Sequence, residues 1–203
     1  MPTRKAPDPG RDGEIAISRG TGYTLFETAV GRCAIAWSVA GVAGVQLPEQ
    51  SLADTRRRVV ERHPGAVEAE PPLPVRRAGD AIARHLATGA ADLSWIRLDM
   101  DRLSPFARRV YEEARSVSVG ATVSYSGLAE RLGRPGAARA VGQALKRNPF
   151  AIVVPCHRVV AAGGGIGGFS AGGGVDAKRR ILEIERAAPM PEIDSPSGGP
   201  RPS

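Results

Sequence analysis

The chain has 203 residues, of which 42% are hydrophobic, enough to bury one full core or two small packed units. Lys and Arg outnumber Asp and Glu by 28 to 21, and the resulting formal charge of +7 favours a polyanionic partner without distinguishing DNA, RNA or an acidic membrane. Three classes are excluded: two distant cysteines cannot form a disulfide framework, no apolar run could span a membrane, and the first residues lack the apolar core of a secretory signal. We therefore expect a cytoplasmic protein with no membrane partner.

Composition divides the chain into four parts. Residues 1–20 and 188–203 are poor in apolar side chains, and such segments cannot bury enough surface to become ordered. Between these disordered ends we predict an N-terminal α/β support domain over 21–101 and a C-terminal, mainly helical domain over 102–187. The fold class is α/β in the broad sense, and more narrowly α+β.

The first predicted domain begins with a small antiparallel sheet. Residues 23–47 alternate between apolar and polar positions and are rich in β-branched side chains, with turns at Gly31 and Gly41. Ser51 then caps a helix that Pro64 stops, and a second helix is predicted over 75–86. A strand over 93–100 is expected to return to the sheet.

The second predicted domain begins at Ser104, a helix cap followed by Pro105 at the first helical position. Apolar side chains recur on one face of this helix until Gly120 ends it. Ser124 caps a short helix that reaches Leu132.

A turn over 133–136 follows, and then a helix over 137–147, which ends because Pro149 forces Asn148 out of the helical region. Helix, glycine turn and helix is the helix-turn-helix layout. Two packed helices with a glycine turn are equally common as a purely structural unit, so spacing alone does not decide between the two.

Residues 131–175 contain no Asp or Glu but several cations, so they carry a local positive charge that attracts phosphate. The cations are Arg131, Arg134, Arg139, Lys146, Arg147 and Arg158. The second helix of the pair is built from small residues, including Ala138, with Arg139 as the long side chain of its first turn. Such a helix suits close approach to a narrow groove and base extrusion. A solvated basic face and a tightly packed core helix are the alternatives.

Cys156 lies between Pro155 and His157, with Arg158 following. A buried structural cysteine is the ordinary expectation, but an imidazole and nearby cations favour the nucleophilic thiolate. The glycine-dense residues 161–174 would let the backbone approach a flat ligand. The last predicted helix carries Glu183 and Glu185, and either carboxylate could orient the histidine of a nucleophile–base pair.

The stretch SYSGLAERLGRPGAARAVGQALKRNPFAIVVPCHRVVAAGGGIGGFS, together with KRRILEIE, closely resembles the O6-alkylguanine-DNA alkyltransferases over about residues 104–186. The motifs AARAVG, RNP and PCHRV occur together and in order, whereas the N-terminal half matches only in outline. The resemblance implies direct-reversal DNA repair by a methylated-DNA–protein-cysteine S-methyltransferase. O6-alkylguanine would be flipped out of the duplex, and its alkyl group would move irreversibly to Cys156 in a single turnover.

The resemblance also implies roles for individual residues. His157 would be the base, acting through a water, with Glu185 holding it, because the lysine-to-glutamate spacing of the last helix fits Lys178 and Glu185. Asn148 would be a hinge before the active-site segment, and Tyr125 would donate its phenol proton to N3 of the leaving guanine. The remaining roles are gap filling by Arg139, DNA contacts by Ala138 and Tyr125, phosphate contacts by Ser126 and Arg134, and a guanine pocket formed with Val159, Phe169 and Ser170.

No metal or redox cofactor is expected for this reaction. Some members of the family carry a structural zinc, but here the candidates are Cys33, His63 and His85, which lack a ligand spacing. The implied partner is double-stranded DNA containing O6-alkylguanine, with O4-alkylthymine as a further candidate substrate, and the protein is expected to be a monomer.

Three other classes remain as alternatives. A non-catalytic lesion sensor would share the fold but lack the acceptor cysteine, which is present here as Cys156. A helix-turn-helix regulator would explain the basic face but not the PCHR motif. A cysteine hydrolase with a Cys-His-Glu arrangement would turn over many times. Phe169, where the family often has a tyrosine, and Ala151, where some members have a proline, leave the accepted size of alkyl group open.

Overall fold

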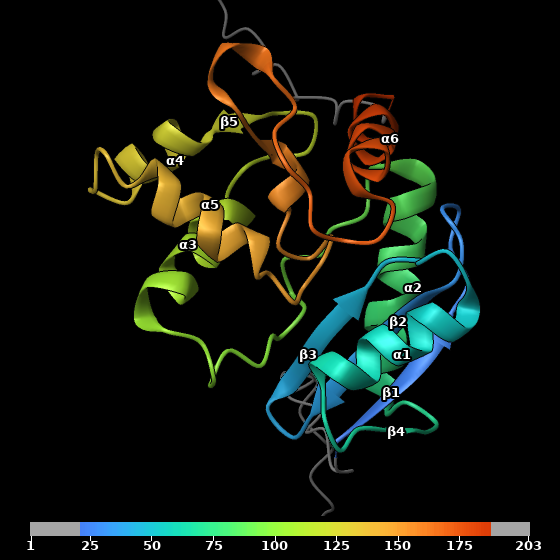
Figure 1. The fold of residues 1–203 in the computed structure, drawn as a ribbon. Coiled ribbons are helices and arrows are strands. Elements are labelled where there is room, and N and C mark those ends of the chain that lie inside the picture. The colour runs from blue at the N-terminus through green and yellow to red at the C-terminus, as the bar shows by residue number, and fades with distance from the viewer. Residues whose placement is uncertain (1–20, 188–203) are drawn as a thin grey trace, which may run out of the picture.

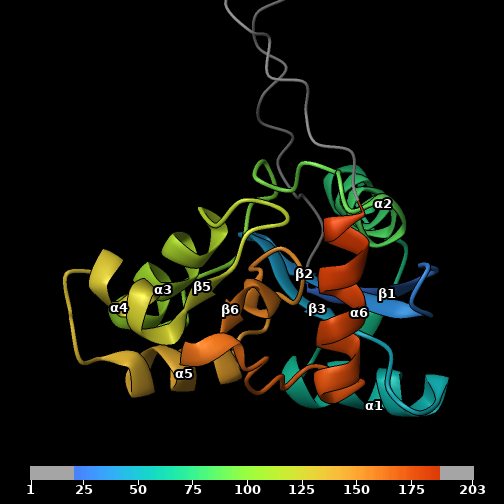
Figure 2. The ribbon, with the colours of Figure 1, turned by 90° about the horizontal axis from the view of Figure 1, so that it is seen from above.

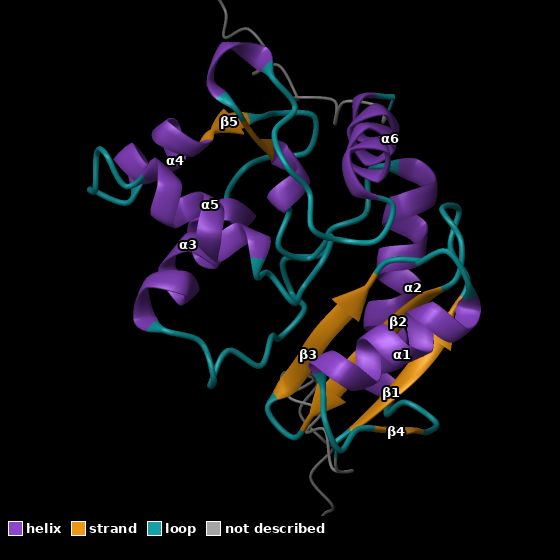
Figure 3. Ribbon diagram, in the orientation of Figure 1, coloured by secondary structure: helices purple, strands orange, loops and turns teal. Residues whose placement is uncertain are grey.

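The computed structural model describes residues 21–187, so the two predicted disordered ends lie outside the described part of the chain. Figure 1 shows a small sheet flanked by helices on one side of the molecule and a group of helices on the other. Figure 3 shows that the long strands all belong to the first part, in agreement with the predicted α+β class. None of the helices within 21–187 is long and apolar enough to cross a membrane.

The sheet is mixed, with strand order β3-β2-β1-β4. Strands β1 (Gly22–Phe26), β2 (Cys33–Ser38) and β3 (Gly41–Gln46) pair antiparallel, as predicted. A short strand that the sequence did not suggest, β4 (Val67–Glu68), pairs parallel to β1. The sheet is therefore antiparallel over its three predicted strands and mixed at this edge, because the intervening helix carries the chain back across the sheet before β4 begins.

Helices cover both faces of the sheet. Helix α1 (Leu52–Arg62) begins at Ser51, whose side chain accepts a hydrogen bond from the Asp54 amide, and α2 (Leu73–Thr88) ends at Gly89. Successive residues of β2 point to opposite faces: Ala34 and Ala36 pack with Val59 of α1, and Ile35 and Trp37 join the core shared with α2.

The segment predicted as a strand over 93–100 does return to β3, where the Val42 amide donates to the Arg97 carbonyl at 2.9 Å and the Asp99 amide to the Val42 carbonyl at 2.7 Å, but no regular strand forms. A single parallel bridge joins Val42 to Leu98. The reason is local: the Ser94 amide donates to the Asp92 carboxylate at 2.8 Å and the Ile96 amide to the Leu93 carbonyl at 3.2 Å, so the chain turns where it was expected to extend.

The second part begins with α3 (Pro105–Arg115), capped by Ser104 as predicted but ending before Gly120. Strand β5 (Val123–Ser124) leads into α4 (Tyr125–Arg131), whose first turn is capped by the Ser124 side chain. A turn connects α4 to α5 (Ala138–Lys146), and both helices pack on α3. The remaining elements are the 3₁₀ helix η1 (Cys156–Arg158), β6 (Val159–Val160), the 3₁₀ helix η2 (Ala162–Gly164) and α6 (Gly174–Arg186).

The two parts are joined by backbone and core contacts. The Val45 amide of β3 donates to the Pro149 carbonyl at 2.8 Å, and Val45 bridges to Phe150. Helix α6 returns from the second part to pack on α2 of the first (Figure 2). One cluster of buried apolar side chains extends through both parts, so the division into two domains at residues 101 and 102 stays a prediction.

Candidate active site

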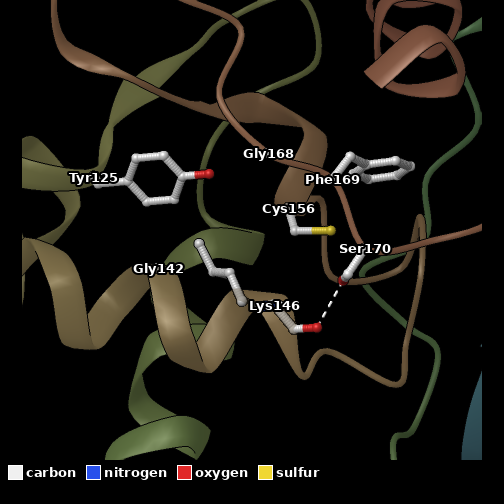
Figure 4. Close-up of a pocket in the computed structure, with 8 residues that line it drawn as sticks. Tyr125, Gly142, Lys146, Cys156, Gly168, Phe169 and Ser170 are labelled. Carbon is white, nitrogen blue, oxygen red and sulfur yellow. Dashed lines mark hydrogen bonds between the residues drawn. The ribbon is translucent and has the colours of Figure 1, made fainter. Parts of the chain in front are cut away.

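A cavity of about 310 Å³ opens beside Cys156 (Figure 4). Its walls come from the start of α4, one side of α5, the first residue of η1 and the glycine-rich loop before α6. The lining residues are Tyr125, Gly142, Leu145, Lys146, Cys156, Gly168, Phe169 and Ser170. The fold thus brings together four of the residues proposed from sequence: Tyr125, Cys156, Phe169 and Ser170.

Cys156 is presented to this cavity by a tightly folded segment that starts at Asn148. The buried Asn148 side chain accepts from the Phe150 amide at 2.9 Å and donates to the Val154 carbonyl at 3.0 Å. Between them Ile152 has a φ of 73°, in the left-handed region that a β-branched residue rarely adopts. Such strain persists only where the surrounding structure enforces it, and Ile152 is buried.

The residue that follows Cys156 in the chain, His157, pairs with a buried carboxylate. His157 Nε2 is 2.8 Å from Glu185 Oε1, and both side chains are fully buried. The other ring nitrogen, His157 Nδ1, is buried and has no hydrogen-bond partner among the described residues. Glu183, the alternative from the sequence, is exposed on α6, so the geometry selects Glu185.

Glu185 is held by more groups than the sequence suggested. The Arg158 guanidinium donates to both carboxylate oxygens, with Nη2 2.8 Å from Oε1 and Nε 3.0 Å from Oε2. Arg158 Nη1 donates in addition to the Val117 carbonyl at 2.6 Å. A second histidine, His85 of α2, approaches Glu185 Oε1 at 2.9 Å. The carboxylate is therefore the centre of a buried cluster of ionisable groups.

The environment sets the protonation states of this cluster. Burial by itself raises the pKa of Glu185, but hydrogen bonds from His157, His85 and Arg158 outweigh it and lower the pKa well below its usual range. Burial lowers the pKa of His157. His157 is therefore a neutral imidazole that donates from Nε2 to Glu185 and keeps the Nδ1 lone pair free to accept a proton.

The neighbouring groups were expected to favour the Cys156 thiolate, but the balance in the folded protein favours the thiol. Burial raises the pKa of the Cys156 thiol, and the hydrogen bond from Asn148 and the charge of Lys178 offset this only in part. The sequence shows the cations next to Cys156, but it does not show that folding removes the thiol from water. A protonated thiol needs a base before it can attack, and the free Nδ1 of His157 can supply one.

Tyr125 faces the same cavity from the start of α4 (Figure 4). Burial and then the nearby Cys156 raise the pKa of its phenol. The phenol therefore stays protonated across the physiological range and can act as a hydrogen-bond or proton donor towards a group bound in the cavity.

Lys178 is a site residue whose role sequence reasoning missed. It is buried on the inner face of α6, and its Nζ donates to the Val159 carbonyl at 2.7 Å and to the Gly168 carbonyl at 3.3 Å. The signal was available, because Lys178 and Glu185 lie seven positions apart and so share one helical face. Val159 is itself buried beneath the site and does not line the cavity.

The glycine-rich loop is also tied to α5, because Ser170 Oγ donates to the Lys146 carbonyl at 2.6 Å (Figure 4). This contact closes the cavity on the side opposite Tyr125. Helix α5 lines the cavity through Gly142 and Lys146. The same helix presents the exposed Arg139 to solvent.

The other residues predicted to contact DNA lie on α4, α5 and the turn between them. Ser126 and Arg134 are exposed, and Ala138 is half-buried at the first position of α5. The Arg134 guanidinium lies 5.9 Å from the centre of the Phe106 ring, and Ser126 Oγ is 2.9 Å from Ser124 Oγ.

The three residues considered for a zinc site have separate surroundings. Cys33 is buried in β2, and burial raises the pKa of its thiol to about 12. His63 packs against Gly44, and His85 against Glu185. Within residues 21–187, no three His, Cys, Asp or Glu side chains form a group that could hold a metal ion.

Comparison with known proteins gives consistent matches. Residues 105–187 match the family model described as 6-O-methylguanine DNA methyltransferase, DNA binding domain. The methylated-DNA–protein-cysteine methyltransferase of Mycobacterium bovis is 32% identical over 166 residues, which cover 81% of this chain and 92% of the relative. That of Mycolicibacterium paratuberculosis is 48% identical over 112 residues, covering 55% of this chain and 67% of the relative.

Solved structures agree with these matches. The crystal structure of Mycobacterium tuberculosis O6-methylguanine methyltransferase is 30% identical with a TM-score of 0.68, covering 85% of this chain and 97% of the other. The structure of Mycobacterium tuberculosis OGT in complex with DNA is 31% identical with a TM-score of 0.63, covering 83% and 95%. From its fold, its cysteine-centred cavity and a relative that is 32% identical over 92% of its own length, the chain belongs to the methylated-DNA–protein-cysteine methyltransferase family.

Proposed function

We propose that this protein repairs alkylated DNA by transferring the methyl group from O6 of guanine to the sulfur of Cys156. The observation that carries the proposal is the arrangement behind the cavity: Cys156 opens into it, and the neutral His157, held by Glu185, has its Nδ1 free. The family relationship supports the same reaction.

The transfer is one displacement at the methyl carbon. The thiol proton of Cys156 passes through a water to His157 Nδ1, and the resulting thiolate attacks the methyl carbon. The S–C bond forms as the C–O bond breaks, and the bonding electron pair leaves with O6 of guanine. Tyr125 donates its phenol proton to N3, so the base leaves neutral. The thioether that remains has no leaving group under these conditions, and the protein acts once.

The lesion must leave the duplex to reach this cysteine. An enzyme that acts on a base inside the stack has to extrude it into a pocket, and the cavity beside α5 is about 310 Å³. We propose that α4 and α5 act as a helix-turn-helix, with Ala138 and the small face of α5 against the DNA and Ser126 and Arg134 on phosphates. Arg139 would fill the gap left by the extruded base. The relative solved with DNA supports a DNA-binding role for this fold.

The proposed partner is double-stranded DNA with O6-alkylguanine, and O4-alkylthymine is a further substrate. We propose that the protein works as a monomer in the cytoplasm. Asn148 would act as the hinge between α5 and the cysteine segment, and Phe169 and Ser170 would bound the guanine pocket.

Substitution of two arginines is expected to separate phosphate contacts from gap filling. Arg134→Ala should reduce the slope of log K against log salt by about one, because one phosphate contact is lost. Arg139→Ala should change that slope less but slow methyl transfer, because extrusion loses its partner. Binding and single-turnover rates over a salt series measure both effects, with Arg179→Ala on α6 as a matched control. Identical behaviour of the Arg134 and Arg139 variants would contradict the two assigned roles.

Stoichiometry distinguishes the proposed transferase from a Cys-His-Glu hydrolase. With methylated duplex in excess, the number of methyl groups removed should equal the number of protein molecules and then stop rising. A steady increase beyond one per molecule would show turnover and exclude single use of the cysteine.

A further inference from the structure

His85 brings the N-terminal part of the chain into the buried cluster at Glu185. It lies on the last turn of α2, is 1% exposed, and is separated from Glu185 by 100 positions in the sequence. None of the roles assigned above to Cys156, His157 and Tyr125 uses it. A buried histidine in contact with Glu185 can change the charge and hydrogen bonding of the carboxylate that holds His157.

Both ring nitrogens of His85 face acceptors. Nε2 is 2.9 Å from Glu185 Oε1, and Nδ1 is 3.1 Å from the Ala91 carbonyl oxygen. A neutral imidazole carries only one N–H, so in either tautomer one nitrogen lone pair would point at an oxygen lone pair. Burial makes such an unmatched contact costly. Both hydrogen bonds are made together only by the imidazolium form.

We infer that His85 is held as an imidazolium that donates to Glu185 and Ala91, and that it is a positioning residue for the His157 relay. The inference rests on the proposed methyl transfer, in which His157 is the base. Glu185 Oε1 then accepts from both histidines. His85 carries two ring protons, whereas His157 carries one and keeps Nδ1 free.

The charges around His85 explain what this arrangement does. The shared carboxylate is that of Glu185 on α6. Three groups face it: His85 from α2, and His157 and Arg158 from η1. With Arg158 and His85 both cationic, the single negative charge of Glu185 is already exceeded before His157 accepts a proton. Burial lowers the pKa of His157, the hydrogen bond and charge of Glu185 raise it in part, and the charges of Arg158 and His85 lower it again. His157 therefore stays neutral to lower pH.

The contact is built into the packing of α2 against α6. The Gly89 amide donates to the His85 carbonyl at 2.7 Å, and Gly89 adopts a φ of 71°. A Cβ atom at residue 89 would lie 2.5 Å from the Ile184 carbonyl oxygen, so this glycine lets the end of α2 rest on the backbone beside Glu185. The N-terminal part thus contributes a charge to the site besides its supporting role.

The first test is NMR spectroscopy of the histidine ring nitrogens in the whole protein at pH 7. His85 should show protons on both nitrogens and His157 on one. A single ring proton on His85 would overturn the inference. The NMR measurement needs no substrate, so its result is valid whether or not the protein transfers methyl groups.

The second test is His85→Gln, which keeps an N–H donor for Glu185 but removes the positive charge. Because His157 must be neutral to accept a proton, activity is lost as pH falls through the pKa of His157. Without the neighbouring cation this loss should begin about half a pH unit higher, giving about threefold slower transfer at the acidic end and little change at pH 8. His63→Gln, a half-buried histidine of the same part, is the matched control.

A wild-type pH profile in a folded His85→Gln protein would overturn the inference. If the variant does not fold, the ring-nitrogen measurement on the unmodified protein decides alone. Absence of methyl transfer by the unmodified protein at every pH would instead refute the proposed function. It would leave the protonation state of His85 unaffected, because the ring-nitrogen measurement does not depend on methyl transfer.

Discussion

Glu185→Gln is expected to destabilise the protein by about 3–5 kcal/mol and to abolish methyl transfer, because it leaves the buried Arg158 guanidinium without its counter-charge. The carboxamide also cannot accept from His85, His157 and Arg158 as a carboxylate does. Urea unfolding followed by circular dichroism measures the first effect, and single-turnover transfer to the protein measures the second.

The loss of unfolding free energy in Glu185→Gln is expected to depend on pH. Hydrogen bonds to Glu185 outweigh burial and lower its pKa in the folded state, so its stabilising contribution is fully present above the pKa of an unfolded glutamate. The difference in unfolding free energy between the two proteins should shrink as pH falls through the acidic range. Glu183→Gln, exposed on the same helix, should match the unmodified protein. Wild-type transfer by Glu185→Gln would contradict the relay.

Tyr125→Phe is expected to slow methyl transfer by about 10²–10⁴-fold while leaving DNA affinity nearly unchanged. The change removes only the phenol oxygen, so the cavity keeps its wall and the guanine loses its proton donor. Because burial raises the pKa of Tyr125, the donor is present throughout the neutral range and the defect should vary little between pH 6 and pH 9.

Rapid-quench single-turnover kinetics with a methylated duplex measures the Tyr125 effect, and binding of the same duplex measures affinity. Tyr23→Phe in β1, which loses a hydroxyl bonded to Glu68 far from the cavity, is the matched control. A Tyr125→Phe protein that transfers at the normal rate would show that the leaving base takes its proton elsewhere.

Local chemistry made most of the fold predictable. Ser51, Ser104 and Ser124 cap helices where their sequence context places them, because side-chain capping depends only on neighbouring residues. The three antiparallel strands follow from alternation and turn glycines. The short parallel strand β4 and the failed strand over 93–100 depend on tertiary connection and local turns, which alternation does not encode.

The site was predictable where residues are adjacent in sequence or share a helical face. Cys156 and His157 are neighbours, and Glu185 falls on the buried face of α6 with Lys178. The contact between His85 and Glu185 joins α2 to α6, and no spacing rule reveals it. The raised pKa of Cys156 also depends on burial in three dimensions, so the sequence suggested a thiolate where the fold gives a thiol.

The central claim is tested most directly by mass spectrometry of intact protein and peptides after mixing with a duplex that contains O6-methylguanine. The account predicts one added methyl group, located on Cys156, with Cys33 unmodified and no methyl group gained by Cys156→Ser. A repaired duplex with an unmodified Cys156, or an unrepaired duplex with a folded protein, would contradict it.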